Sequence, residues 1–285
     1  MEVLVSKGFL IYAENNGNVD YIYQAYTLAL SIKASQTEFK AVSLVTNTDQ
    51  IPEKYLNVFD NIIPIPWYDV PGTEFSAEHR WKLYHVTPYE ETIVLDSDML
   101  LLEDISLWWE YCTNFDIRYC SKIKNYKNEV IVQDKAHRKT FLENKLNNPY
   151  CALHYFKKSD NAFEFYKTLE FVIKNWEWCY TKFAPQHYQN WLSMDLSVAI
   201  AIEISGMQHE VLDNLCPLEF VHMKPAIQNW PIIPESWQTT VPYFLNPQGE
   251  LFVGNIKQFK LFHYVEKDFI TPELVDQLED LVNGR

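Results

Sequence analysis

The amino-acid sequence predicts an α/β fold with a mixed, mostly parallel central sheet flanked by helices, and three observations support this prediction. Strand-like apolar runs alternate with helix-like runs at short intervals in the first third of the chain. Apolar residues make up 47% of the 285 residues, which provides for a sizeable core. No repeat, low-complexity segment or clear linker divides the chain, so we expect one domain over residues 1–285.

The individual elements can be predicted in chain order. An apolar strand is expected over residues 9–13, and turn-forming residues 14–18 follow it. Asp20 is placed to cap a helix over 21–32. Residues 121–148 are rich in Lys and Asn without clear periodicity, so we interpret them as an excursion or a lid. The other expected elements are strands at 41–45, 62–65, 92–95, 150–156, 218–223 and 259–264, and helices at 78–86, 161–178, 191–202 and 272–284.

The predicted central strand, residues 92–95, leads directly into Asp96 and Asp98, and a second apolar run follows at 99–101. Residues i and i+2 of a strand point to the same side, so both carboxylates can face one point beyond the strand end. Open α/β sheets bind ligands at this edge, and a divalent cation is a common reason to hold two carboxylates together. The alternative is an acidic turn between two strands, but the flanking apolar runs favour a metal site.

Three further charged residues are candidates for the same site. Arg80 and Lys82 lie in the helix expected before the central strand, from which they could reach a ligand phosphate. A solvated surface position is the alternative for Lys82. Asp195 lies near the start of the predicted helix 191–202, where it is either a helix cap or a catalytic carboxylate.

Composition excludes several classes of function. The net charge of −14 argues against a nucleic-acid partner and against a basic membrane-binding surface. No apolar run approaches the ~20 residues needed to span a bilayer, and the N-terminal segment lacks a cleavage pattern. We therefore expect a soluble, cytoplasmic protein. The five cysteines form no C-x-x-C pair, so we expect reduced thiols, most of them in the core.

Taken in order, these features resemble the nucleotide-sugar glycosyltransferases that have a single Rossmann-like GT-A domain and an Asp-x-Asp motif. The similarity is strongest to the glycogenin-like group, which includes bacterial lipopolysaccharide galactosyltransferases and galactinol synthases, and it extends from about residue 9 to residue 267. Residues 94–98 match the family's metal motif, with Ser97 in place of the usual Ala. The resemblance implies a nucleotide-binding half over about residues 1–110 and an acceptor-side half over about 111–285.

The resemblance also assigns roles to individual residues. Asp195 matches an Asp that lies beside the reacting sugar. The segment from His263 to Lys267 resembles a motif whose His is the third metal ligand and whose Lys holds the diphosphate, although the motif's Gly, Pro and Trp are absent and the spacing is shorter. His222, followed by Lys224-Pro225, is an alternative third ligand. The residues that the resemblance places near the nucleotide are Tyr12, Ala13, Asn15, Tyr21, Lys82, Asp96 and Ser97.

The resemblance implies a hexosyltransferase that moves a sugar from a UDP-sugar donor to a carbohydrate, glycolipid or glycoprotein acceptor, with retention of configuration. Mn²⁺ or Mg²⁺ held by Asp96, Asp98 and a His would stabilise the leaving diphosphate together with Lys267. Asp195 would stabilise the oxocarbenium-like sugar, position the acceptor or act as a base. A nucleotidyltransferase is an alternative, but those enzymes usually carry a basic Gly-rich loop, and residues 14–18 contain no Arg or Lys. A catalytically inactive binding relative ranks last, because the Asp pair and candidate His residues are present.

Overall fold

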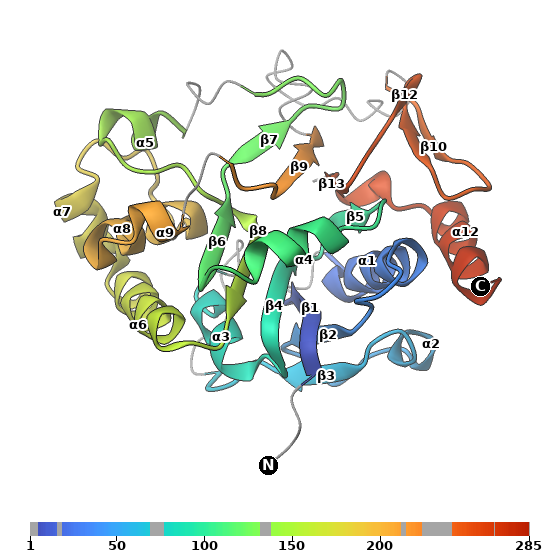
Figure 1. The fold of residues 1–285 in the computed structure, drawn as a ribbon, viewed down its shortest axis with the longest axis horizontal. Helices are drawn as coiled ribbons and strands as arrows, with labels where there is room; N and C mark the ends of the chain where they lie inside the picture. Colours follow the sequence, from blue (N-terminus) through green and yellow to red (C-terminus); the bar gives the residue numbers. More distant parts are fainter. Residues whose placement is uncertain are drawn as a thin grey trace.

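The centre of the structure, a computed structural model, is a six-stranded sheet of order β3-β2-β1-β4-β8-β6 (Figure 1). The strands β3, β2, β1 and β4 are parallel, while β8 is antiparallel to both β4 and β6. The six strands are β1 (Val5–Ala13), β2 (Val42–Thr46), β3 (Asn61–Pro64), β4 (Tyr89–Asp96), β6 (Ile117–Cys120) and β8 (Tyr150–Lys157). The structure describes residues 5–15, 19–68, 77–131, 138–211, 215–223, 241–264 and 266–284.

Both faces of β1 are buried, and the alternation of its side chains divides the core into two layers. Phe9, Ile11 and Ala13 belong to the cluster that contains α1 (Tyr21–Ser35) and α4 (Ser106–Cys112). The intervening Leu10 and Tyr12 belong to the cluster on the other face, which contains α6 (Asp160–Lys174), α7 (Trp176–Phe183) and α8 (Met194–Ser205). Figure 1 shows these two groups of helices on opposite sides of the central sheet. This arrangement confirms the predicted α/β fold with helices flanking the sheet.

Ser97 and Asp98 form the junction between the central sheet and a second sheet. The chain leaves β4 at Asp96 and enters β5 (Met99–Leu101) after only these two residues. The second sheet has the order β5-β13-β9-β7, with β13 (Leu261–His263), β9 (Glu219–His222) and β7 (Lys122–Lys124). Residues far apart in the sequence are therefore brought to the point where β4 ends. A third, small sheet contains β10 (Tyr243–Leu245), β11 (Leu251–Val253) and β12 (Ile256–Lys257).

Several elements differ from their predicted bounds. The helix expected over 161–178 is divided at Asn175, whose Nδ2 donates 2.8 Å to the Phe171 carbonyl and so competes with helix continuation. Segment 121–148, expected to be irregular, contains β7 and α5 (Lys139–Glu143). Within the described residues, the other helices are α2 (Glu53–Leu56), α3 (Leu83–Val86), α9 (Gln208–Val211), α12 (Pro272–Asn283) and the 3₁₀ helices η1 (Arg80–Lys82) and η3 (Lys267–Phe269).

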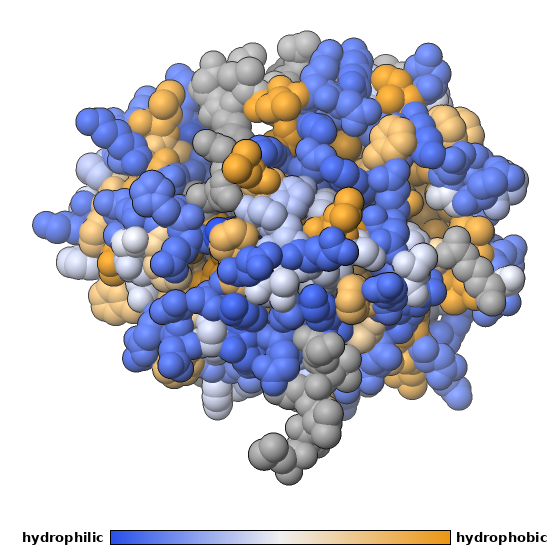
Figure 2. All heavy atoms as spheres, in the orientation of Figure 1, coloured by the Kyte–Doolittle hydropathy of each residue, from blue (hydrophilic) through white to orange (hydrophobic). Residues whose placement is uncertain are grey.

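The surface is mostly polar, as expected from the charge of the chain. Figure 2 shows hydrophilic side chains over most of one face, with apolar residues scattered among them. None of the helices described here is long and apolar enough to cross a bilayer. All five cysteines are buried free thiols, as the sequence predicts: Cys112, Cys120, Cys151, Cys179 and Cys216.

Candidate active site

The candidate site lies at the carboxyl ends of β1 and β4. The chain builds β2 and β3 on one side of β1 and then returns to place β4 on the other side. Open α/β sheets form a ligand-binding crevice at such a reversal of strand order. The register pairs Tyr12 of β1 with Asp96 of β4, so both residues lie at this edge.

Strand pairing in the second sheet brings His263 to the same place. Strand β13 runs antiparallel to β5 and pairs His263 with Met99, the residue after Asp98. One ligand atom from each of Asp96, Asp98 and His263 can be chosen so that all three lie within 4.8 Å of one another. The structure thus assembles two carboxylates and one imidazole, the three residues that the sequence nominated as metal ligands.

Three nitrogen-bearing side chains contact the two carboxylates. Nζ of Lys267 lies 2.6 Å from Oδ2 of Asp98, and Nε2 of His263 lies 3.0 Å from Oδ1. Arg80 forms an ion pair with Asp96. Burial opposes ionisation of Asp98, but His263 and Lys267 outweigh it and hold the pKa of Asp98 well below its usual range.

The chemistry of these three side chains fits a divalent cation. Carboxylate oxygens are the ligands preferred by Mg²⁺ and Mn²⁺, and a neutral imidazole is a common additional ligand. His263 is largely buried, and its Nδ1 has no hydrogen-bond partner among the residues that the structure describes. The alternative ligand, His222, pairs with His263 in the parallel register of β9 and β13, with 4.8 Å between ring centroids. His222 is not a member of the three-residue group, and residues 224 and 225 lie outside the described part of the chain.

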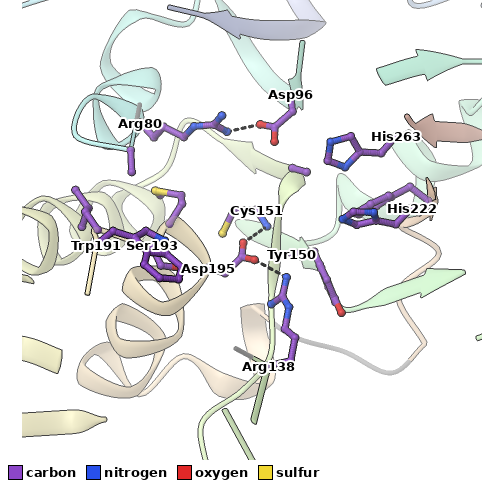
Figure 3. Close-up of a pocket in the computed structure, with 15 residues that line it drawn as sticks. Arg80, Asp96, Arg138, Tyr150, Cys151, Trp191, Ser193, Asp195, His222 and His263 are labelled. Carbon is purple, nitrogen blue, oxygen red and sulfur yellow. Dashed lines mark hydrogen bonds and ion pairs between the residues drawn. The ribbon is translucent and has the colours of Figure 1, made fainter. Parts of the chain in front are cut away.

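A cavity of about 210 Å³ extends from this group toward the start of α8. Figure 3 shows Asp96 and His263 at one end and Asp195, held by Arg138 and Cys151, at the other. The cavity therefore joins two of the three candidate metal ligands to the candidate catalytic carboxylate. The lining residues are Ala77, Arg80, Asp96, Arg138, Tyr150, Cys151, Ala152, Trp191, Leu192, Ser193, Met194, Asp195, Phe220, His222 and His263.

Asp195 is not the cap of its helix. Ser193 is the N-cap of α8, and its side chain accepts a hydrogen bond from the Leu196 N–H. The Asp195 carboxylate instead bonds outside the helix, with Oδ1 2.8 Å from the Cys151 N–H and Oδ2 2.5 Å from Nη2 of Arg138.

The predicted nucleotide-side residues meet near the end of β1. The Asn15 side chain accepts a hydrogen bond from the Tyr21 N–H at 2.8 Å, and Nζ of Lys267 lies 5.2 Å from the centre of the Tyr21 ring. Ala13 is buried at the end of β1, and the Tyr12 ring lies 5.1 Å from the Arg80 guanidinium carbon. Ser97, which lies between Asp96 and Asp98 in the sequence, is buried. The rest of the predicted turn, residues 16–18, lies outside the described part of the chain.

The Lys82 side chain contacts the backbone at Trp67. It is buried rather than solvated, and Nζ donates a hydrogen bond to the Trp67 carbonyl at 2.5 Å. Lys82 does not line the cavity, whereas Arg80, two residues earlier on the same 3₁₀ turn, does.

Arg138 and Tyr150 line the cavity although the sequence does not single them out as site residues. Arg138 lies in the segment that has no periodicity, and no motif marks it. Its guanidinium carbon lies 3.7 Å from the centre of the Tyr150 ring. Its ion pair with Asp195 joins residues that are distant in the sequence, so it can be identified only from the folded structure.

No protein-family model and no curated protein matches the sequence. Among solved structures, the fold is similar to the apo form of the bifunctional glycosyltransferase WbbM, with a TM-score of 0.53 and 13% identity over 97% of this chain and 49% of that one. It is also similar to the apo form of mouse xyloside xylosyltransferase 1, with a TM-score of 0.51 and 12% identity over 91% of this chain and 97% of that one. The chain thus spans about half of the length of WbbM. These similarities and the strand order show that the chain has the GT-A fold that the sequence predicted.

Proposed function

We propose that this chain is a metal-dependent glycosyltransferase that uses a nucleoside-diphosphate sugar, a UDP-sugar, as its donor. The observation that carries the proposal is one cavity with Asp96 and His263, two of the three candidate metal ligands, at one end and a separately held carboxylate, Asp195, at the other. Such a cavity can bind a diphosphate through its metal-side end while the attached sugar faces Asp195. The GT-A fold supports this reading, and we propose that residues 1–285 form one domain with a nucleotide-side half and an acceptor-side half.

At the metal-side end, Asp96, Asp98 and His263 would hold Mn²⁺ or Mg²⁺. The bound ion would supply Lewis-acid stabilisation of the negative charge that develops on the leaving diphosphate. Lys267 and Arg80 now compensate the two carboxylates and lie at the same end, so their positive charges are available to diphosphate oxygens.

At the other end, Asp195 would act on the sugar. Cleavage of a sugar–diphosphate bond leaves positive charge on the anomeric carbon, which a fixed carboxylate nearby stabilises. The Cys151 N–H and Arg138 each engage one oxygen of Asp195, so the carboxylate has a defined position on the cavity wall. We further propose transfer of a hexose with retention of configuration to a carbohydrate, glycolipid or glycoprotein acceptor.

A thermal-shift panel of nucleoside diphosphates, with and without Mn²⁺ or Mg²⁺, tests the proposal. We expect stabilisation by UDP that requires the metal and is lost in the Asp96→Ala/Asp98→Ala variant. The exposed Asp49→Ala variant is the matched control and should respond as the wild type does. Absence of any metal-dependent nucleotide shift in the wild type would contradict the proposal. Pyrophosphate release from a nucleoside triphosphate and a sugar phosphate would favour a nucleotidyltransferase instead.

A further inference from the structure

The side chain of Arg138 connects three parts of the acceptor-side half at the wall of the cavity. Nη1 donates 2.8 Å to Oδ1 of Asn148 and 3.1 Å to the Pro149 carbonyl, just before β8. Nη2 donates to Asp195 on α8, and the guanidinium plane lies over the Tyr150 ring. Guanidinium groups lose little freedom when several donors are fixed at once, because their donors are held in one rigid plane.

These contacts define how Asp195 is presented. The Arg138 side chain is 13% exposed and that of Asp195 is 24% exposed, so the ion pair is shielded from solvent yet open to the cavity. One oxygen of the carboxylate is fixed by Arg138 and the other by the Cys151 N–H. Since each carboxylate oxygen has a second lone pair, Asp195 can still face a ligand while its orientation stays fixed.

We propose that Arg138 is a positioning residue, which fixes the Asp195 carboxylate at the sugar end of the cavity and acts on catalysis through it. The inference rests on the proposed transferase function for its effect on rate, but the physical link between the two side chains does not. Tyr150 contacts the guanidinium through a cation–π interaction, so the unit consists of Tyr150, Arg138 and Asp195.

The effect on rate follows from the chemistry proposed for Asp195. A charge that stabilises a developing cation works only from a fixed distance and direction, because the benefit comes from preorganisation. A displacement of about 1 Å can cost about 100-fold in rate. Loss of the ion pair between Arg138 and Asp195 should therefore lower kcat. The diphosphate-binding end of the cavity is formed by other residues and should keep its affinity for the donor.

A purely architectural role for Arg138 makes a different prediction. In that case loss of Arg138 would loosen the start of β8, and the damage would add to that of any Asp195 variant. Lys139, the next residue, is exposed on α5 and carries the same charge, so Lys139→Gln controls for the change in net charge.

The test uses the full chain with Arg138→Gln, Arg138→Lys, Asp195→Asn, the Arg138→Gln/Asp195→Asn double variant and Lys139→Gln. Donor turnover, measured as transfer or slow donor hydrolysis, should fall about 10- to 100-fold in kcat for Arg138→Gln and less for Arg138→Lys, with KM for the donor within about 3-fold. In the Asp195→Asn background, Arg138→Gln should cause little further loss. The metal-dependent shift with UDP should be the same in all variants.

The same set of variants separates the two ways in which the inference can fail. If Arg138→Gln costs as much turnover with Asn at position 195 as with Asp, or weakens UDP binding equally, Arg138 does not act through Asp195. If the wild type binds no nucleotide, the proposed function has failed. The midpoints of thermal unfolding of the same variants still test whether Arg138 and Asp195 are coupled. Non-additive effects of Arg138→Gln and Asp195→Asn on the unfolding midpoint would then support the link between the two side chains, and additive effects would overturn it.

Discussion

The Nε2 atom of His263 lies 3.0 Å from Oδ1 of Asp98, and the antiparallel pairing of β5 with β13 creates this contact. His222 lies on the adjacent strand and belongs to the same cavity, but only His263 joins the two carboxylates. We predict that His263→Ala lowers the apparent affinity for Mn²⁺ in the presence of UDP by about 10-fold or more. His222→Ala should leave this affinity unchanged. Titration of Mn²⁺ at a fixed UDP concentration measures the affinity of both variants. A larger loss of affinity in His222→Ala than in His263→Ala would make His222 the third ligand.

Lys267 should contribute to diphosphate binding. A hydrogen bond to a charged group contributes about 1.5–3 kcal/mol, so we expect Lys267→Met to weaken UDP binding by about 10- to 100-fold. Isothermal titration with UDP and Mn²⁺ measures the change. The exposed Lys54, which pairs with Glu279 away from the cavity, provides Lys54→Met as the control. Equal affinities for the wild type and Lys267→Met would place Lys267 outside the binding site.

His154 should make stability depend on pH. Its ring is buried, Nδ1 lies 3.1 Å from the Cys151 carbonyl and Nε2 lies 3.1 Å from the Tyr166 hydroxyl, so the neutral imidazole donates to the carbonyl and accepts from the hydroxyl. Burial lowers the pKa of His154 to about 3. The unfolded chain binds the proton near the ordinary value of about 6.5, so the stability contribution is complete above pH 6.5 and is lost progressively toward pH 3.

At pH 5 this single group should reduce the free energy of unfolding by about 2 kcal/mol relative to pH 8. Urea denaturation at both pH values, for the wild type and His154→Gln, isolates the effect from other titrating groups. The variant should show a correspondingly smaller difference between the two pH values. If the two proteins show the same difference between pH 5 and pH 8, the pKa of His154 is the same in the folded and unfolded chain.

Gly8 should be intolerant of any side chain. A Cβ atom at this position would overlap the ring of Tyr89, which is fully buried and hydrogen-bonded at 2.6 Å to Ser43. We expect Gly8→Ala to reduce the free energy of unfolding by about 1–3 kcal/mol, as overpacked cores do. In a Tyr89→Ala background the same substitution should cost much less, and denaturation of the four proteins in this cycle measures the difference. A full cost without the ring would point to backbone strain instead.

Local patterns in the sequence were sufficient to predict the central sheet and two of the three candidate metal ligands, Asp96 and Asp98. The apolar run Ile93-Val94-Leu95 leads directly into Asp96, and the spacing of two residues predicts that Asp96 and Asp98 point to the same side. His263 could be nominated only through the family resemblance, because its distance from Asp98 depends on the pairing of β5 with β13.

Other features depend on choices that a pattern leaves open. Ser193 and Asp195 are both good cap residues, and only the structure shows that Ser193 caps α8 and leaves Asp195 for the cavity. Arg80 and Lys82 are two residues apart, yet the 3₁₀ turn sends one to Asp96 and the other to the Trp67 carbonyl. Arg138 has no local signal for a site role, because its ion-pair partner Asp195 lies 57 residues away in the sequence.

The position of β13 between β5 and β9 also has a consequence for the order of events during synthesis on the ribosome. Asp96 and Asp98 emerge first, and the chain supplies Lys267 only 169 residues after Asp98. A nascent chain, or a fragment ending before β13, would therefore carry two close carboxylates without two of the groups that compensate them. If the proposed function is correct, nucleotide affinity should therefore appear only after β13 has been synthesised and paired with β5.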